Sequence, residues 1–186
     1  MPALETRRLR LVPITLEMVE GVLAHDKVAA EEALDRNLEQ LGWPTGATFP
    51  DTWPNDDLIA RAFPYSREAI RAAPDVRLWG DTLVVTKETP PRVLGSVVFK
   101  GRPTDGVAEV GYGIEDGSRG QGLATEATLA CIEWALAQDG IVAVQAITFA
   151  AHLASLGVIA NCGMTPCGSR EHPIFGELLV FELRRP

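Results

Sequence analysis

Two glycines stand just ahead of a stretch with helical spacing, and this position indicates a site for an anion. Gly120 and Gly122 lie in the segment RGQGLA, and apolar residues recur at helical intervals after it. Glycines before a helix let successive backbone N–H groups point at one spot, and the helix dipole adds partial positive charge there. This arrangement is suited to holding a phosphate group.

A carboxylate lies a few residues earlier, on a strand face that carries no other large side chain. The segment VAEVGYGI over residues 107–114 has the alternation of a strand, in which Glu109 shares one face with Gly111 and Gly113. A bare face lets a ligand lie directly against the backbone. The stretch therefore combines an anion cradle, a groove and a carboxylate.

Four segments of this chain resemble motifs of the GNAT superfamily of acyl-CoA-dependent N-acetyltransferases. RGQGLA fits its R/Q-x-x-G-x-G/A signature, with Arg119, Gly122 and Ala124 at the defining positions. AEVGYGI is similar to the AE-(I/L/V)-G-Y-W-(I/L) strand of the ribosomal-protein-alanine acetyltransferase (RimJ/RimL-type) branch. The opening ETRRLRLVPIT, with Val12 where the branch usually has arginine, and the segment HLASLGVIANCGM from His152 resemble two more of its motifs. The resemblance spans nearly the whole chain.

The resemblance implies an activity and a cofactor. It implies direct transfer of an acetyl group from acetyl-CoA, as co-substrate, to a primary amine. The acceptor stays open between a protein N-terminus and a small-molecule amine. Such a transfer needs an uncharged amine, a donor for the oxyanion that forms, and stabilisation or a proton for the departing thiolate.

The resemblance also implies two groups of cofactor-binding residues. The loop and first helical turn are expected to cradle the pyrophosphate, mainly through backbone N–H groups: Arg119, Gly120, Gln121, Gly122, Leu123, Ala124 and Thr125. The second half of the strand is expected to line the pantetheine arm: Gly111, Tyr112, Gly113 and Ile114.

Glu109 is the candidate for accepting the proton of the acceptor amine, directly or through water. An α-amine with a pKa of about 7.7–8.0 needs only a modest base. The alternatives are a carboxylate that attracts and orients a cationic acceptor, and a solvated strand residue. The sequence does not separate base from anchor. Glu115 and Asp116, in the turn after the strand, are expected to be solvated.

Ser155 is the candidate for stabilising the departing thiolate, because the first turn of a helix favours developing negative charge. The alternative is a serine that only caps its helix. His152 shares its helical face and stands where the family has an asparagine that contacts the pantetheine amides. Histidine keeps one donor and one acceptor, so it could contact the pantetheine amides as the asparagine does. The alternatives are a histidine that titrates near neutrality and a site that has lost the family's function.

Gly113 departs from the family too, since it replaces a tryptophan and opens space beside the acyl chain. An acyl group larger than acetyl would use that space, although a strained or bulged strand is the plainer explanation. The departures at His152 and Gly113 also raise a rival function, a non-catalytic acyl-CoA-binding sensor or scaffold.

Composition favours one domain over residues 1–186 of a cytoplasmic protein. The chain is 46% hydrophobic, with no apolar run near the roughly 20 residues that span a bilayer and no leader of signal-peptide type. Three cysteines without metal-type spacing favour reduced thiols and no metal, with Cys131 in the core. The net charge of −8 argues against nucleic-acid binding. The one feature in favour of such binding is the basic cluster of Arg7, Arg8 and Arg10. A homodimer is compatible with the family.

The first half of the chain is expected to begin with a strand over residues 7–12, which ends at Pro13. Helices follow, one capped by Thr15, one over 28–41 ended by Gly42, and one over 56–73 with Pro64 as a point of breakage. Between the last two, Trp43 and Trp53 lie in an irregular segment. They either pin it to the core or form a substrate-side wall.

The second half alternates strands and helices, which predicts a mixed, mostly antiparallel α/β sheet of about six to seven strands with helices on both faces. The strands are expected at 78–86, 92–100, 107–114, 141–149, 164–170 and 177–184, and the helices at 123–137 and 152–162.

Overall fold

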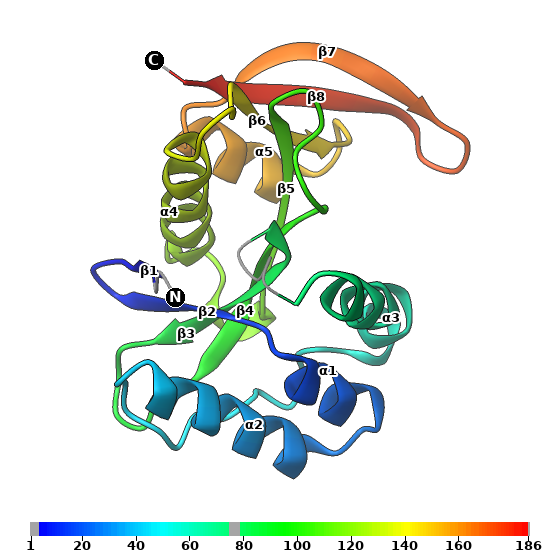
Figure 1. Cartoon of the computed structure of the whole chain (residues 1–186). Helices are drawn as coiled ribbons and strands as arrows, with labels where there is room; N and C mark the ends of the chain where they lie inside the picture. Colours follow the sequence, from blue (N-terminus) through cyan, green and yellow to red (C-terminus); the bar gives the residue numbers. More distant parts are fainter. Residues whose placement is uncertain (1–3, 75–78, 186) are drawn as a thin grey trace.

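The computed structural model describes residues 4–74 and 79–185, and these residues form one mixed sheet with helices around it (Figure 1). Its strands are β1 (Leu4–Glu5), β2 (Leu9–Pro13), β3 (Asp81–Thr86), β4 (Val93–Phe99), β5 (Val107–Ile114), β6 (Ala143–Thr148), β7 (Thr165–His172) and β8 (Gly176–Arg184). The order across the sheet is β1-β2-β3-β4-β5-β6-β8-β7, and only β5 and β6 pair in parallel. The predicted mixed, mostly antiparallel sheet is confirmed. The described residues give eight strands, because the two-residue β1 is too short to show alternation in the sequence.

The helices begin and end close to the predicted residues. They are α1 (Leu16–Leu23), α2 (Lys27–Gln40), α3 (Asp56–Ala72), α4 (Leu123–Leu136) and α5 (Leu153–Asn161), with a short 3-10 turn, η2 (Asp116–Ser118). The Thr15 side chain accepts a hydrogen bond from the Met18 N–H, as expected of a cap, and Gly42 follows α2 with φ of 71°. The expected break at Pro64 is wrong, because α3 continues through it.

Several strand boundaries differ from the sequence prediction by up to three residues. β2 includes Pro13, which still pairs with Thr82 of β3. The strand expected over 78–86 begins at Asp81, and its predicted first residue, Leu78, lies outside the described residues. β6 is shorter than expected, ending at Thr148, before Phe149.

Alternate residues of β2 and β3 face two separate hydrophobic clusters. Leu11 and Val84 belong to the cluster that packs under α4 and α5, while Val12 and Leu83 belong to the cluster under α1, α2 and α3. This alternation follows from the two-residue period of a strand. Helices therefore cover both faces of the sheet, as predicted.

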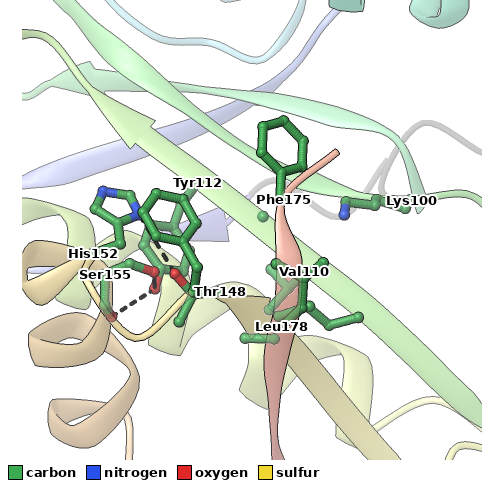
Figure 2. Close-up of a pocket in the computed structure, with 12 residues that line it drawn as sticks. Lys100, Val110, Tyr112, Thr148, His152, Ser155, Phe175 and Leu178 are labelled. Carbon is green, nitrogen blue, oxygen red and sulfur yellow. Dashed lines mark hydrogen bonds between the residues drawn. The ribbon is translucent and has the colours of Figure 1, made fainter. Parts of the chain in front are cut away.

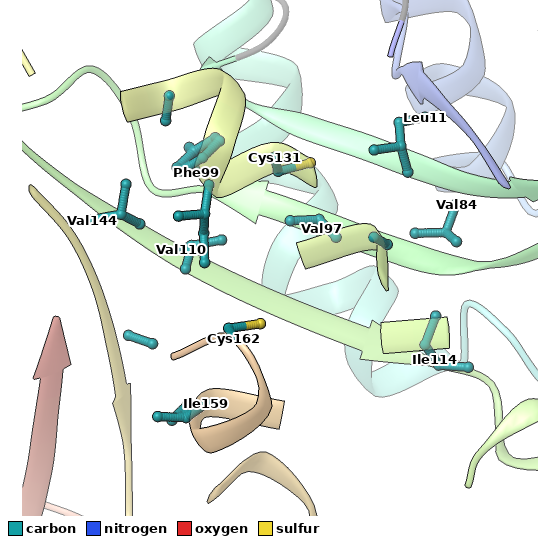
Figure 3. Close-up of a cluster of buried hydrophobic side chains, with 14 of the residues drawn as sticks. Leu11, Val84, Val97, Phe99, Val110, Ile114, Cys131, Val144, Ile159 and Cys162 are labelled. Atoms are coloured by element: carbon teal, nitrogen blue, oxygen red, sulfur yellow. The ribbon is translucent and has the colours of Figure 1, made fainter. Parts of the chain in front are cut away.

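The α4–α5 cluster fixes the position of the second half of the sheet (Figure 3). Val110 of β5 packs in it with Val97 of β4, Cys131 of α4 and Ile159 of α5. Cys131 is 2% exposed, which confirms that it is a core residue. Complete burial of side chains of this size stabilises the fold by roughly 1.5–3 kcal/mol each. α5 is thereby held against β5.

Trp43 and Trp53 pack into the cluster under α1, α2 and α3. Trp53 is 8% exposed and stacks on Phe49 with ring centroids 6.2 Å apart. The Arg10 guanidinium lies 5.7 Å from the centroid of a Trp43 ring. These contacts favour the structural reading of the irregular segment, in which the tryptophans pin it to the core.

The sheet splits between β5 and β6. The two strands pair over only three residues each, ending at Glu109 and Gln145. Beyond that point β5 continues beside β4, and β6 continues beside β8. Within residues 4–74 and 79–185, the facing edges of β5 and β6 therefore pair with no further strand over residues 110–114 and 146–148. None of the helices in the described part of the chain is long and apolar enough to cross a membrane.

Burial of two cysteines predicts selective alkylation. Cys131 and Cys162 are buried and Cys167 is exposed; burial raises the pKa of Cys131 to about 12 and that of Cys162 to about 11. Because the thiolate is the reactive form, iodoacetamide at pH 8 should label the folded protein once, at Cys167, and the unfolded protein three times. Mass spectrometry of the intact protein measures this. The variant Cys167→Ser should stay unlabelled while folded, and fast labelling at Cys131 would contradict the packing.

Candidate active site

A cavity of about 280 Å³ opens where β5 and β6 separate (Figure 2). It brings together residues from five segments: Lys100, Val110, Gly111, Tyr112, Ala146, Ile147, Thr148, Phe149, His152, Ser155, Phe175 and Leu178. Four residues singled out from the sequence are among them: Gly111, Tyr112, His152 and Ser155. Figure 2 shows Tyr112, Thr148, His152 and Ser155 gathered at one end, with Phe175 and Lys100 toward the other.

Tyr112 and Ser155 meet inside the cavity. Tyr112 faces α5 because it shares a strand face with the buried Val110, and Ser155 lies in the first turn of α5. The Tyr112 hydroxyl oxygen lies 3.0 Å from Ser155 Oγ and 3.0 Å from the Ser155 carbonyl oxygen. Burial raises the pKa of Tyr112, and the hydrogen bond to Ser155 only partly opposes this, so the phenol is neutral near pH 7. Within the described residues, Ser155 Oγ bonds to the Tyr112 hydroxyl, and the N-cap residue His152 makes no side-chain capping bond.

His152 stands at the start of α5, as its N-cap residue. Its Nδ1 lies 3.4 Å from the Thr148 hydroxyl, and its ring stacks on Phe149 with centroids 5.2 Å apart. Both partners come from the end of β6 and the turn after it. The imidazole is thus oriented along the cavity wall, and its Nε2 edge is the part left for a ligand.

Glu109 lies on the face of β5 opposite to Tyr112. This face is not bare, because two cationic side chains lie on it beside Glu109. Its carboxylate contacts the Lys100 ammonium and lies 3.7 Å from the Arg170 guanidinium, with its side chain 25% exposed. Glu109 does not line the cavity itself, whereas Lys100 does. The sequence showed the glycines beside Glu109 but not the two cations, which come from β7 and from just after β4.

The glycine loop leads directly into α4. Gly120 and Gly122 have φ of 74° and 73°, in the left-handed region that favours glycine. Gly122 is the N-cap of α4, and no side chain of the described residues caps this helix. The first N–H groups of a helix have no partner within it, so these amides are available to an anion.

Arg119 braces this loop. Its Nε donates to the Ile114 carbonyl (3.2 Å), and its guanidinium lies 2.6 Å from the Asp116 carboxylate. Asp116 is exposed, as expected, but the expectation that Glu115 is solvated is wrong. Glu115 is buried, because Arg92 (3.3 Å) and the Ser118 hydroxyl both donate to it.

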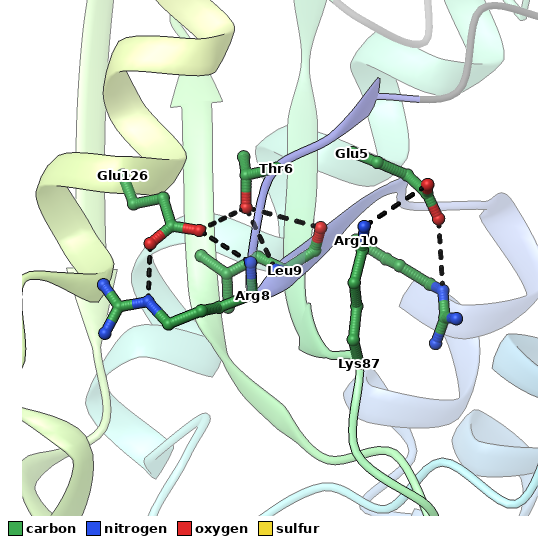
Figure 4. Close-up of polar contacts among 7 residues, drawn as sticks. All are labelled: Glu5, Thr6, Arg8, Leu9, Arg10, Lys87 and Glu126. Atoms are coloured by element: carbon green, nitrogen blue, oxygen red, sulfur yellow. Dashed lines mark hydrogen bonds and ion pairs between the residues drawn. The ribbon is translucent and has the colours of Figure 1, made fainter.

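A second brace ties the loop to the turn between β1 and β2 (Figure 4). Glu126 in the first turn of α4 accepts from the Arg8 Nε (2.6 Å), the Arg8 N–H (2.9 Å) and the Thr6 hydroxyl (2.5 Å). Partial burial would raise the pKa of Glu126, but the bonds from Thr6 and Arg8 together outweigh it and hold the pKa below its usual value. Arg8 also donates to the Gln121 carbonyl (3.0 Å). The loop conformation is thus fixed from two sides.

The remaining strand residues differ in exposure. Gly113 is exposed, and a Cβ placed on it would meet no atom within 4 Å, so the predicted open space is present. Its pairing with Ser96 belongs to a regular stretch of β4–β5 register without a bulge. Ile114 is 8% exposed and packs in the α4–α5 cluster.

Sequence reasoning missed the cavity residues that distant segments contribute. Lys100 follows β4, Phe149 follows β6, and Phe175 and Leu178 come from the β7–β8 hairpin. No local pattern marks them, because they converge only when the sheet forms. Phe175 is 58% exposed, so this part of the cavity lining is in contact with solvent.

Comparison with known proteins gives one family. The model of the acetyltransferase (GNAT) domain matches residues 8–165. A protein of Bacillus subtilis (strain 168), described as the uncharacterized N-acetyltransferase YjdG, is 29% identical over 142 residues, which are 76% of each chain.

Two solved structures show the same fold. An acetyltransferase from Agrobacterium tumefaciens str. C58 superposes with a TM-score of 0.64 at 20% identity, over 99% of this chain and 95% of that one. The ribosomal-protein-S5-alanine acetyltransferase from Vibrio fischeri superposes with a TM-score of 0.65 at 11% identity, over 100% and 97% of the chains. The architecture expected from the sequence motifs, a GNAT fold, is confirmed.

Proposed function

The chain belongs to the GNAT acetyltransferase family, and we propose that it transfers an acetyl group directly from acetyl-CoA to a primary amine at the split between β5 and β6. The observation that carries this proposal is the cavity at the split, which holds the Ser155 and Tyr112 hydroxyls. The second half of β5 leads from this cavity to the glycine loop at the start of α4. Acetyl-CoA is the co-substrate of the family.

The proposed binding mode follows the course of β5. The pyrophosphate binds the amides of residues 119–125, and the pantetheine arm runs along Gly111 to Ile114, a strand length of roughly 10 Å. His152 contacts the pantetheine amides in the role of the family's asparagine. The thioester then lies beside Ser155. The edge of β5 that faces β6 supports this mode, because its backbone groups can bond the amides of the pantetheine, while Arg119 already bonds the Ile114 carbonyl.

The proposed chemistry uses one group on each side of β5. Glu109 accepts the proton of the acceptor amine, directly or through water, and the neutral amine attacks the thioester carbonyl carbon. The attacking nitrogen releases its second proton to solvent as the amide forms. The carbon–sulfur bond breaks with its electron pair on sulfur, and Ser155 Oγ donates a hydrogen bond to the thiolate. The Glu109 carboxylate contacts the Lys100 ammonium and lies 3.7 Å from the Arg170 guanidinium, so two cations flank the proposed base.

We assign the chain to the RimJ/RimL-type branch from its motifs, and this leaves two acceptor classes. Short peptides with free N-terminal alanine or serine represent the first, and matched amines such as alaninamide and ethanolamine represent the second. Release of free CoA in the presence of each acceptor measures preference as kcat/KM. Higher values for peptides support a protein N-terminus as acceptor, and higher values for the small amines contradict it.

Replacing Ser155 with alanine should lower kcat about tenfold while the KM for acetyl-CoA changes by less than about twofold. The reason is that the need for a donor grows only as the thiolate forms, so the bond is stronger in the transition state than in the bound substrate. Steady-state kinetics measure both parameters. Ser169→Ala, on the exposed strand β7, is the matched control. Equal effects on kcat and KM, or none on either, would remove Ser155 from the reaction.

A further inference from the structure

The hydrogen bond between the Tyr112 and Ser155 hydroxyls can run in either direction, because each hydroxyl carries one proton and either can be the donor. The Tyr112 oxygen lies 3.0 Å from two acceptors, Ser155 Oγ and the Ser155 carbonyl oxygen. It can donate to only one of them at a time. Which one it chooses decides what Ser155 presents to the cavity.

In the first arrangement, Tyr112 donates to the Ser155 carbonyl. Ser155 then donates to the phenol oxygen, and its hydroxyl shows the cavity only lone pairs. A thiolate beside it would face an acceptor, which is repulsive. Ser155 is of no use to the leaving group in this arrangement.

In the second arrangement, Tyr112 donates to Ser155 Oγ. The serine proton is then free to point into the cavity. The Ser155 carbonyl loses little, because within α5 it is placed to accept the N–H of Ile159, four residues on. The donated bond from the phenol also polarises the serine hydroxyl and makes it a better donor.

We propose that Tyr112 is a positioning residue that turns the Ser155 hydroxyl proton toward the sulfur of the departing CoA thiolate. This rests on the proposed function, in which the thioester lies beside Ser155. Negative charge growing on the sulfur favours the second arrangement over the first. The sulfur keeps the electron pair of the broken carbon–sulfur bond and takes a proton from solvent after it leaves, so neither hydroxyl is consumed.

A structural role for Tyr112 must be separated from this one, since its bond also ties β5 to α5. Tyr112→Phe keeps the ring and its packing and removes only the hydroxyl. We expect kcat to fall about fivefold to tenfold, with the KM for acetyl-CoA and the melting temperature close to those of the wild type. The chain has one other tyrosine, Tyr65, which is 78% exposed, so Tyr65→Phe is the matched control and should change nothing.

The double variant gives the decisive comparison. If Tyr112 acts through Ser155, adding Tyr112→Phe to Ser155→Ala should slow the enzyme no further than Ser155→Ala alone. Multiplied effects would overturn the inference, because they mean that Tyr112 acts independently. A wild-type kcat in Tyr112→Phe would overturn it as well. Normal kinetics in Ser155→Ala alone would instead remove the proposed role of Ser155 itself.

A second measurement avoids any loss of folding. Producing the Tyr65→Phe protein with monofluorotyrosine changes only residue 112, because the chain has two tyrosines. Fluorine keeps the shape of the ring and makes the phenol a stronger donor. We expect kcat to change in this protein and to stay unchanged when Ser155→Ala is also present. An unchanged kcat with Ser155 in place would overturn the inference.

Discussion

Replacing Glu109 with glutamine should lower kcat at neutral pH by about 10²-fold or more, the usual contribution of a positioned general base. Glutamine keeps the shape of the side chain and its ability to hydrogen-bond, but it cannot accept the proton of the amine. Raising the pH should restore part of the activity, because solvent then deprotonates the acceptor. If Glu109 only anchors a cationic acceptor, the main change should be a higher KM. The profiles of kcat and KM against pH, with one acceptor amine, distinguish the two.

The ion pairs of Glu109 call for two controls. Glu109→Gln releases the Lys100 ammonium, which lines the cavity and would repel a cationic amine. Adding Lys100→Gln to Glu109→Gln removes that repulsion. The activity of the double variant should therefore stay low if the loss in Glu109→Gln is the loss of the base. Glu182→Gln is the matched control for Glu109→Gln. Glu182 is also a strand glutamate that pairs with an arginine, and it lies in register with Gln145. A Glu109→Gln profile that superimposes on the wild type would exclude both roles.

Replacing Gly122 with valine should weaken acetyl-CoA binding by more than about tenfold. Gly122 has φ of 73°, where a β-branched residue is strained, and relief of that strain would turn the amides of the loop away from the pyrophosphate. A Cβ there would also lie 3.7 Å from the Arg8 guanidinium, so added bulk meets the brace formed by Arg8. Calorimetric titration with acetyl-CoA measures the affinity.

Gly140→Val is the matched control for this loop variant. Gly140 has φ of 78° with nothing within 4 Å of a Cβ, and it lies beyond the other end of α4. Both variants should lose about 1–3 kcal/mol of stability from strain, but only Gly122→Val should lose affinity. Undiminished affinity in Gly122→Val would remove the assignment of the phosphate site.

Features that depend on neighbours in the sequence were predictable. The cap at Thr15, the alternation of β5 and the glycine loop directly ahead of α4 each follow from a few consecutive residues. Glu109 was placed on the correct strand and face for the same reason. The order of the helices, and of every described strand except β1, followed from periodicity together with turn and cap residues.

Features that depend on distant residues were not predictable. Glu115 is in a turn, and turn carboxylates are usually solvated. It is buried here because Arg92, which is 23 positions away in the sequence, donates a hydrogen bond to its carboxylate. Arg170 reaches Glu109 from β7, and the β7–β8 hairpin supplies Phe175 to the cavity. The net charge of −8 gave no sign that two cations surround the candidate base. Such contacts are set by the topology of the sheet.

Direct transfer within the cavity is tested best by one single-turnover experiment. The protein is mixed with acetyl-CoA that carries a labelled acetyl group, with and without an amine, and the protein, free CoA and acetylated amine are quantified by mass spectrometry. The proposed function predicts unlabelled protein without the amine, and equal amounts of free CoA and acetylated amine with it. A labelled protein that passes its acetyl group to the amine, or bound acetyl-CoA that no peptide or small amine consumes, would contradict it.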